Sequence, residues 1–422
     1  MQRIPSLLFQ SSKVLNTTSC SSIISSRCYH DFLRFSTPGG AGRVPLHAPT
    51  IIGVASSRGT RGHQEDYYAF ASLLLDPEGL QAGLKRTLGI DWNPKNISDP
   101  LTRQVVFVGL YDGHGGSTVS QYLRQELHGL FESVDEAHIP ELYLWIKDQG
   151  GYFKRFRGGA LAPWINQSNG TPPLDLEARA TQAFFEVDRL LSIESEAKTC
   201  GATASVAILH SLDTRPFFSS TKLVLTVAHA GDARVLLCGT NDCLVRPMTE
   251  NHHPDTLMEA TRLRRMMGSS LITDSYGESR WMGALANTRA LGDLKWKPYG
   301  VTPEPDVRTM LLEGTKWAYM IIVSDGVSSI LSDQEIVDVA RGAPSPKKAA
   351  EQILSYSEEL GGEDNATVVV VPLSGWREIQ GPDRTRALRE YRSQQAGKCF
   401  ELSFPPLINS VMIVGSERQR RM

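Results

Sequence analysis

The sequence predicts an α+β protein in which two groups of β-strands form a sandwich flanked by helices. Short runs of β-branched and aromatic residues recur from Pro49 onward and are separated by glycines, as in strands joined by turns. Only a few long stretches carry apolar residues at helical spacing. These stretches lie between the two groups of strands and do not follow every strand, which favours a sandwich over a series of β-α-β units.

Eight segments have the length and composition of strands. They are Thr50–Ala55, Tyr67–Leu74, Val105–Tyr111, Ala204–Leu209, Leu223–Ala230, Arg234–Cys238, Trp317–Val323 and Thr367–Val371. Helical spacing begins after Ser117 and recurs over Leu176–Leu191, Gln334–Ala340 and Pro346–Glu359. We expect one folded domain over residues 49–375, with surface insertions at about 76–103 and 132–173, where glycine and proline breaks interrupt the pattern.

The composition excludes several classes of protein. The chain has 422 residues, of which 41% are hydrophobic, so it can bury a large core. Its formal net charge of -2 creates no overall field that would attract nucleic acid or an anionic membrane surface. No apolar run approaches the roughly 18 residues of a membrane span. The six scattered cysteines predict neither a disulfide framework nor a zinc site.

The two ends of the chain differ from the rest. The first thirty residues contain no Asp or Glu but many serines and three basic residues, Arg3, Lys13 and Arg27. This profile is typical of a mitochondrial transit peptide, which we assign to residues 1–29, followed by a linker over 30–48. A serine-rich terminus without a targeting role is the alternative. Residues 376–422 form a tail whose arginines at near-helical spacing predict a solvated helix face.

Carboxylates occur where four of the predicted strands begin or end. Asp112 and Asp325 follow apolar strands, Asp364 precedes one, and Glu65 and Asp66 open another. A single Asp-Gly pair is usually an ordinary turn, but strand ends on a rigid scaffold can direct several side chains at one point. Hard oxygen ligands without cysteine or clustered histidine indicate Mg²⁺ or Mn²⁺ rather than Zn²⁺.

These segments resemble, in order, the motifs of the type 2C metal-dependent protein phosphatase family (the PPM family). The motifs are Arg61-Gly62-His63-Gln64-Glu65-Asp66, Tyr111-Asp112-Gly113-His114-Gly115-Gly116, Cys200-Gly201-Ala202-Thr203-Ala204, Ala230-Gly231-Asp232-Ala233-Arg234, Gly283 to Asp293, Thr302-Pro303-Glu304-Pro305, Ser324-Asp325-Gly326 and Glu363-Asp364-Asn365. The resemblance spans roughly residues 49 to 373. It implies an antiparallel β-sandwich flanked by helices, with a binuclear metal centre in a cleft at one end.

The resemblance also implies the metal ligands. Carried over position by position, Asp112 would bridge two Mg²⁺ or Mn²⁺ ions and the Gly113 carbonyl would bind one of them. Asp325 and Asp364 would hold the other ion. Two further carboxylates, Glu65 and Asp66, would act mainly through metal-bound waters.

The chemistry implied is direct attack on phosphorus by a hydroxide generated between the two ions, without a phosphoenzyme. Arg61 would hold the phosphate oxygens, because guanidinium geometry matches a phosphate edge. His114 would protonate the leaving serine or threonine alkoxide, unless it is a bystander in a glycine-rich turn. Asp232 could reach an outer metal or cap its turn. Ser329 stands where many relatives have another Asp, which speaks against a third ion.

The resemblance therefore predicts a protein serine/threonine phosphatase that acts on phosphoproteins and is similar to the mitochondrial branch of the family. The composition of residues 1–29 predicts that it works in the mitochondrial matrix. A catalytically inactive relative that binds phosphoproteins or scaffolds a complex is one alternative, although Asp112, Asp325 and Asp364 are all present. Hydrolysis of small phosphate esters is another. The long insertions favour a protein substrate, and the sequence leaves the oligomeric state open.

Overall fold

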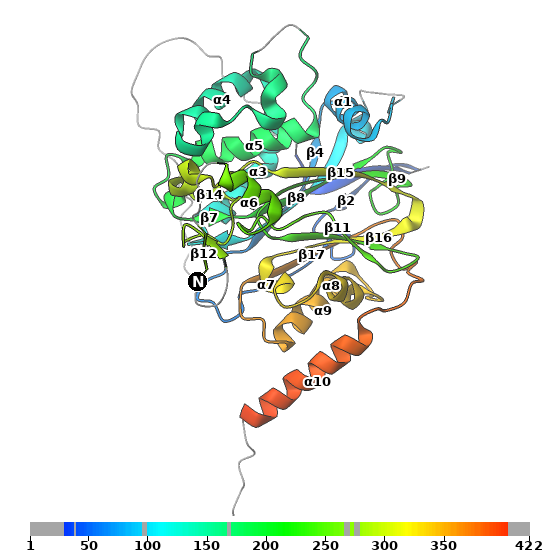
Figure 1. The fold of residues 1–422 in the computed structure, drawn as a ribbon. Coiled ribbons are helices and arrows are strands. Elements are labelled where there is room, and N and C mark those ends of the chain that lie inside the picture. The colour runs from blue at the N-terminus through cyan, green and yellow to red at the C-terminus, as the bar shows by residue number, and fades with distance from the viewer. Residues whose placement is uncertain are drawn as a thin grey trace, which may run out of the picture.

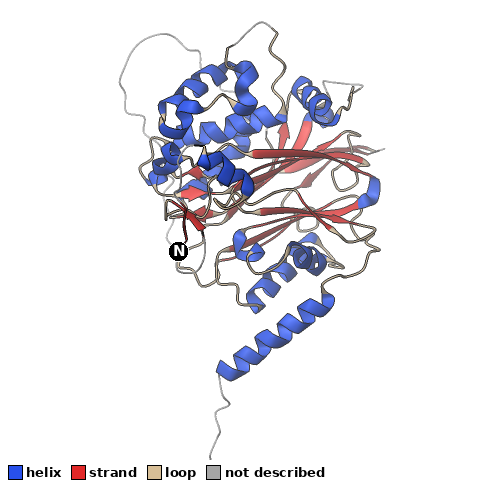
Figure 2. Ribbon diagram, in the orientation of Figure 1, coloured by secondary structure: helices blue, strands red, loops and turns tan. Residues whose placement is uncertain are grey.

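Two stacked five-stranded sheets form the body of the protein (Figures 1 and 2). The computed structural model describes residues 29–37, 39–94, 99–166, 170–265, 271–273 and 279–403. The first sheet has the order β15 (Asp306–Glu313), β9 (Lys222–Ala230), β8 (Ala204–Ser211), β5 (Gln104–Tyr111), β4 (Tyr67–Leu74). The second has the order β11 (Val245–Pro247), β10 (Arg234–Gly239), β16 (Trp317–Val323), β17 (Ala366–Pro372), β3 (Gly53–Ser57). All neighbouring strands in both sheets are antiparallel.

The main core lies between the two sheets. Alternate residues of a strand point to opposite faces, so Val106 and Val108 of β5 face inward and pack with Ile322 and Val369 of the second sheet. Phe107 of β5 points to the outer face, where helices cover it. Both faces of the central strands are therefore apolar, which explains why these strands appear in the sequence as continuous hydrophobic runs.

Helices cover the outer face of each sheet, which gives four layers. α3 (Thr118–Ser133) and α5 (Leu176–Leu191) pack on the first sheet, and α8 (Asp333–Ala340) and α9 (Pro346–Glu359) pack on the second (Figure 1). The predicted α+β sandwich is confirmed. All eight predicted strands overlap observed ones, whereas β11 and β15 of the two main sheets were not predicted.

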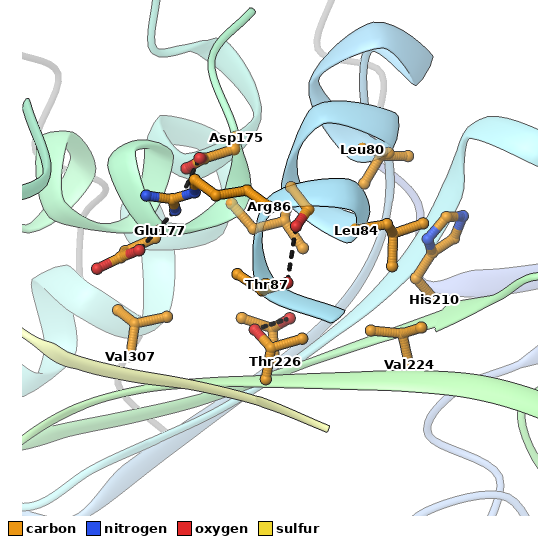
Figure 3. A pocket seen from close by; sticks show the side chains of 13 residues that line it. Leu80, Leu84, Arg86, Thr87, Asp175, Glu177, His210, Val224, Thr226 and Val307 are labelled. Carbon is orange, nitrogen blue, oxygen red and sulfur yellow. Dashed lines mark hydrogen bonds and ion pairs between the residues drawn. The ribbon is translucent and has the colours of Figure 1, made fainter. Parts of the chain in front are cut away.

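The first expected insertion is built into this body. α1 (Pro77–Leu88) begins where the Asp76 side chain accepts a hydrogen bond from Gly79 N, and α2 (Pro100–Arg103) follows it. A hollow of about 230 Å³ separates α1 from the first sheet, and Arg86 closes one side of it (Figure 3). Arg86 Nη2 lies 2.7 Å from Asp175 and 2.5 Å from Glu177, which ties α1 to the start of α5.

The second expected insertion has a small core of its own. It contains η1 (Glu136–His138), α4 (Ile139–Asp148), η2 (Gly151–Arg155) and η3 (Gly159–Trp164). Leu142, Phe153 and Trp164 are buried in this core together with Phe185 of α5. The insertion is therefore a folded extension that rests on α5 rather than a long loop.

The expectation of a linker over residues 30–48 is wrong. β1 (Phe32–Thr37) and β2 (Gly40–Pro45) form a hairpin, and Leu33 and Leu46 are buried in the core between the sheets. Gly42 leaves room for the ring of Phe35, which would lie 2.4 Å from a Cβ at that position. Residues 1–28, which hold most of the expected transit peptide, lie outside the described residues.

The first residues of the tail run along the helices of the second sheet. The tail then continues as α10 (Arg386–Ser403), which extends away from the sandwich next to these helices (Figure 1). Buried Asp338 accepts hydrogen bonds from the backbone N–H groups of Arg384 and Thr385 at 3.0 and 2.9 Å. Arg386 is exposed, as expected for a solvated helix face. Arg392 differs, because its Nη1 forms an ion pair with buried Glu335 at 2.8 Å. Within the described residues, no helix is long and apolar enough to cross a membrane.

Candidate metal centre and active site

The predicted carboxylates come together because the strands that carry them end at one edge of the sandwich. Antiparallel register places the end of β5 beside the start of β4, and the end of β16 beside the start of β10. Just beyond these ends lie Asp66, Asp112, Asp232 and Asp325. Strands of both sheets therefore contribute acidic side chains to the same place.

Three of these carboxylates form a tight group. Among the described residues, one ligand oxygen each from Asp112, Asp232 and Asp325 lies within 4.8 Å of the other two. Buried oxygens of Asp66, Asp112 and Asp232 accept no hydrogen bond from the described part of the chain. Buried polar atoms are rarely left without a partner, so these oxygens fit a site for a cation.

The electrostatics of the group lead to the same conclusion. Burial raises the pKa of Asp66 to about 6, although Ser324 donates a hydrogen bond to it at 2.8 Å. Burial and then the charge of Asp232 raise the pKa of Asp325 to about 7. Burial and the neighbouring Asp325 raise the pKa of Asp112 well above its usual range. Several buried acids that repel one another are stabilised as anions by a bound cation.

Nearly all of the predicted site residues line one cavity of about 610 Å³. Its wall includes Arg61, Glu65, Asp112, Gly113, His114, Asp232, Asp325 and Asp364. Asp66 is 3% exposed and is absent from the lining, so it lies beneath the others. Asp364 lies outside the tight group. Its Oδ2 accepts a hydrogen bond from Arg61 Nη2 at 2.7 Å, which is also an ion pair. Asp232, for which the sequence left open an outer metal or a turn cap, lies within the tight group.

Asn365 holds the loop that carries Arg61 and Glu65, and sequence reasoning gave it no role. Its Oδ1 accepts a hydrogen bond from Glu65 N at 2.7 Å, and its Nδ2 donates to the carbonyls of Arg58 and His63 at 2.9 and 3.0 Å. The side chain is only 6% exposed. An Asn beside a predicted ligand in a tight turn was the only signal in the sequence.

Gly113 packs too closely for any side chain. A Cβ at this position would lie 2.6 Å from both Glu65 O and Ser120 Oγ. Ser120 Oγ itself donates to Glu65 O at 2.7 Å. The glycine therefore brings the backbone after Asp112 against the loop of Glu65, where both can face the cavity.

His114 is oriented by Asp293, a contact that the sequence did not reveal. Nε2 of His114 lies 2.7 Å from Oδ2 of Asp293, which is 1% exposed. Burial acts to lower the pKa of His114, but the hydrogen bond and charge of Asp293 outweigh it and raise the pKa. Gly201 makes room for the pair, because a Cβ there would lie 2.4 Å from Asp293 Oδ2. With Nε2 engaged, Nδ1 is the ring nitrogen left to serve a substrate.

Asp232 pairs with a histidine, and the position where many relatives have a second aspartate is Ser329. His253 Nε2 lies 3.2 Å from Asp232 Oδ2, and Ser329 also lines the cavity. Burial acts to raise the pKa of Asp232, but His253 outweighs it and lowers the pKa. Asn251 and Asn287 line the cavity in the same region. Each has a buried amide oxygen that accepts no hydrogen bond from the described residues.

The residues present fit a hard divalent cation. The donors are carboxylate and amide oxygens, several of them buried without a hydrogen-bond partner among the described residues. Oxygen-only sites of this kind suit Mg²⁺ or Mn²⁺. The cavity combines this acidic group with one guanidinium and one imidazole, so it can hold cations, an oxyanion and a proton donor together.

Comparisons with known proteins show the family to which the chain belongs. Residues 86–366 match the sequence model of the family described as protein phosphatase 2C. Protein phosphatase 2C homolog 4 of Schizosaccharomyces pombe is 29% identical over 86% of this chain and 92% of its own length. The mitochondrial protein phosphatase 1K of Xenopus laevis is 28% identical over 65% of this chain and 63% of its own length.

Solved structures share the fold. A Caenorhabditis elegans sex-determining protein has a TM-score of 0.52 at 20% identity, and covers 79% of this chain and 68% of its own. A serine-threonine phosphatase 2C of Toxoplasma gondii has a TM-score of 0.51 at 18% identity, and covers 81% of this chain and 98% of its own. At these identities the likeness concerns the four-layer architecture alone.

Proposed function

We propose, because the chain belongs to the protein phosphatase 2C family, that its acidic cavity is where phosphoserine and phosphothreonine of protein substrates are hydrolysed. The chain is a metal-dependent protein serine/threonine phosphatase. The single observation that carries the proposal for the site is the tight group of Asp112, Asp232 and Asp325, whose ligand oxygens lie within 4.8 Å of one another.

The proposal assigns the metal-binding role to this chain's own oxygens. Asp112, Asp325 and Asp364 would hold two divalent cations, Mg²⁺ or Mn²⁺, with the Gly113 carbonyl as a further ligand. Glu65 and Asp66 would orient water around them. Bound cations of this kind supply Lewis acidity, which activates water and neutralises the charge of the phosphoryl group.

Asp232 supports a modest revision of the ligand set. It lies within the tight group, and its pairing with His253 keeps it ionised. We therefore include Asp232 among the residues that face the cations, while Ser329 offers no charge with which to hold a third ion.

Two residues would act on the substrate directly. Arg61 is 61% exposed at the cavity wall and uses Nη2 for Asp364, so its other nitrogens can donate to phosphate oxygens. His114 would give the proton on Nδ1 to the leaving alkoxide. Asp293 would accept a hydrogen bond from Nε2 and stabilise the imidazolium. In this proposal the carboxylates bind the cations, Arg61 binds the phosphate oxygens and His114 protonates the leaving group.

Metal removal tests the proposal. A phosphothreonine peptide should be hydrolysed with added Mn²⁺ or Mg²⁺, and activity should vanish in EDTA and return when the metal is restored. Asp112→Asn should lose several orders of magnitude in kcat, whereas Asp91→Asn, a matched change at a surface carboxylate that is 78% exposed, should not. Full turnover in chelator, or wild-type turnover by Asp112→Asn, would show that the site is wrongly placed.

We also propose that the protein works in the mitochondrion. The support is the acid-free, serine-rich composition before Asp31 and the likeness to the mitochondrial phosphatase of Xenopus laevis. Placement in the matrix rests on the composition alone.

A further inference from the structure

A buried ion pair lies behind the catalytic cavity rather than in it. Lys297, in η5 (Leu294–Tyr299), places Nζ 2.7 Å from Oδ2 of Asp188 on α5, and both side chains are 2% exposed. Neither residue lines the cavity. Burying two charges is costly, and an apolar pair of similar volume is often as stable, so the pair is weakly explained by stability alone.

The remaining hydrogen bonds of the pair all go to one turn. Asp188 Oδ1 accepts from Gly292 N at 2.8 Å, and Lys297 Nζ donates to Ala290 O at 2.6 Å. The turn therefore has a fixed donor and a fixed acceptor on either side of Leu291. Asp293, the partner of His114, is the next residue along the chain.

This turn needs to be held. Gly292 and Asp293 are consecutive residues in the left-handed region, with φ of 73° and 51°. A left-handed conformation costs a non-glycine residue roughly 1–2 kcal/mol, so the backbone of Asp293 has to be fixed by its surroundings. Asp293 N also donates to Cys200 O at 3.0 Å.

A three-stranded sheet transmits the position of the turn to the histidine. β14 (Leu291–Gly292), β7 (Gly201–Ala202) and β6 (Gly113–His114) pair in that order, with Gly292 and His114 on opposite sides of Gly201. Because Gly201 has no side chain, Asp293 reaches across it to His114. Any shift of the turn by a fraction of an ångström would change this 2.7 Å contact directly.

We propose that Asp188 and Lys297 are positioning residues for dephosphorylation, which hold the turn of residues 290–293 so that Asp293 orients His114 toward the leaving group. The inference rests on the proposed role of His114 as proton donor. It assigns a function in the reaction to α5, whose other contacts are with the core and with both insertions.

The test compares substrates that differ in their need for a proton. Asp188→Leu combined with Lys297→Met removes both charges at once and takes the acceptor from Gly292 N. We expect turnover of a phosphothreonine peptide to fall about 10- to 100-fold, and turnover of p-nitrophenyl phosphate to fall less than about threefold, because nitrophenolate leaves without protonation. Asp188→Asn with Lys297→Gln keeps an oxygen for Gly292 N and an uncharged donor for Ala290 O, and should retain most of the peptide activity.

The same helix offers a matched control. Arg179 is also buried on α5, where Nη1 donates to the carbonyls of Phe131 and Glu132 at 3.0 and 3.1 Å. Arg179→Met should lower the melting temperature and leave the ratio of the two activities unchanged. Should the Leu/Met variant not fold, Asp188→Glu keeps both charges, displaces the carboxylate by one methylene and carries the same expected change in ratio.

His114→Ala in the same assay separates this inference from the proposed function. If His114→Ala loses the peptide activity selectively and the pair variants do not, the positioning role is wrong and the proton donor stands. If His114→Ala slows both substrates equally, the proton-donor role is wrong and the positioning role falls with it. A selective loss in both sets of variants, with an unchanged ratio in Arg179→Met, is the result expected.

Discussion

Replacing Asn365 with alanine should loosen the loop that carries Arg61 and Glu65. The substitution removes one acceptor and one amide donor that together make three hydrogen bonds, to Glu65 N and to the carbonyls of Arg58 and His63. Each is a bond between a buried side chain and a loop backbone, so no other group of the variant side chain can replace it.

The magnitude follows from the number of bonds. At about 1 kcal/mol net for each bond, the change costs about 3 kcal/mol, or about two powers of ten in the equilibrium between the ordered and the open loop. Apparent affinity falls with the fraction of binding-competent protein. We therefore expect KM for a phosphothreonine peptide, and the concentration of Mn²⁺ needed for half-maximal rate, to rise by up to about 100-fold.

Steady-state kinetics with a Mn²⁺ titration measures both quantities, and Asn241→Ala, at an exposed turn, is the control. At saturating peptide and metal, the variant should recover much of the wild-type kcat, because the loop is disordered rather than absent. A folded Asn365→Ala protein with wild-type KM and metal dependence would refute this account of the loop.

The remaining predictions concern pH and the N-terminus. Burial alone would raise the pKa of Glu259, but Arg262 and Arg289 lower it to about 2 from its usual 4.5, so its stabilisation is present above about pH 4.5 and is lost toward pH 2. Urea unfolding of wild type should thus lose up to about 3 kcal/mol more than Glu259→Gln over this range, and parallel profiles would contradict it. Removing residues 1–28 should leave activity unchanged and move the protein to the cytosol on fractionation. Removing residues 1–48 should also cost about 4 kcal/mol in unfolding free energy, because Leu33 and Leu46 are lost from the core. A truncated form that still reaches mitochondria would exclude a transit peptide.

The central strands could be predicted because both of their faces are buried. Val105–Tyr111 and Trp317–Val323 are apolar along their whole length, and their predicted bounds agree with β5 and β16 to within one residue. β15 escaped prediction because it is an edge strand with partly exposed residues, among them Asp306 and Arg308, and it lacks a continuous apolar run. The hairpin of residues 32–45 escaped prediction because most of its residues are exposed or half-buried, so its two strands lack a continuous apolar run.

The candidate site divides in the same way. Its acidic residues adjoin strands, so their grouping follows from the order of motifs along the chain. Asp293 and Asn365 depend instead on the folding back of distant segments. The Asp293 contact with His114 spans 179 positions, and the Asn365 contact with Glu65 spans 300. Nothing local to either residue distinguishes it from an ordinary turn residue, because the information lies in which two turns meet.

The tight carboxylate group has a mechanical consequence for the sandwich. Asp112 belongs to the end of one sheet, Asp325 to the end of the other, and Asp232 to the connection between them. A cation on these oxygens would link the two sheets, and without it the repulsion between the carboxylates would lower the stability of this edge of the sandwich. A ligand at 100 times its dissociation constant adds about 2.7 kcal/mol to stability. Chelation should therefore lower the stability of the protein as well as its activity. Activity should return at once when metal is restored to protein that is still folded, and slowly when the protein has unfolded and must refold.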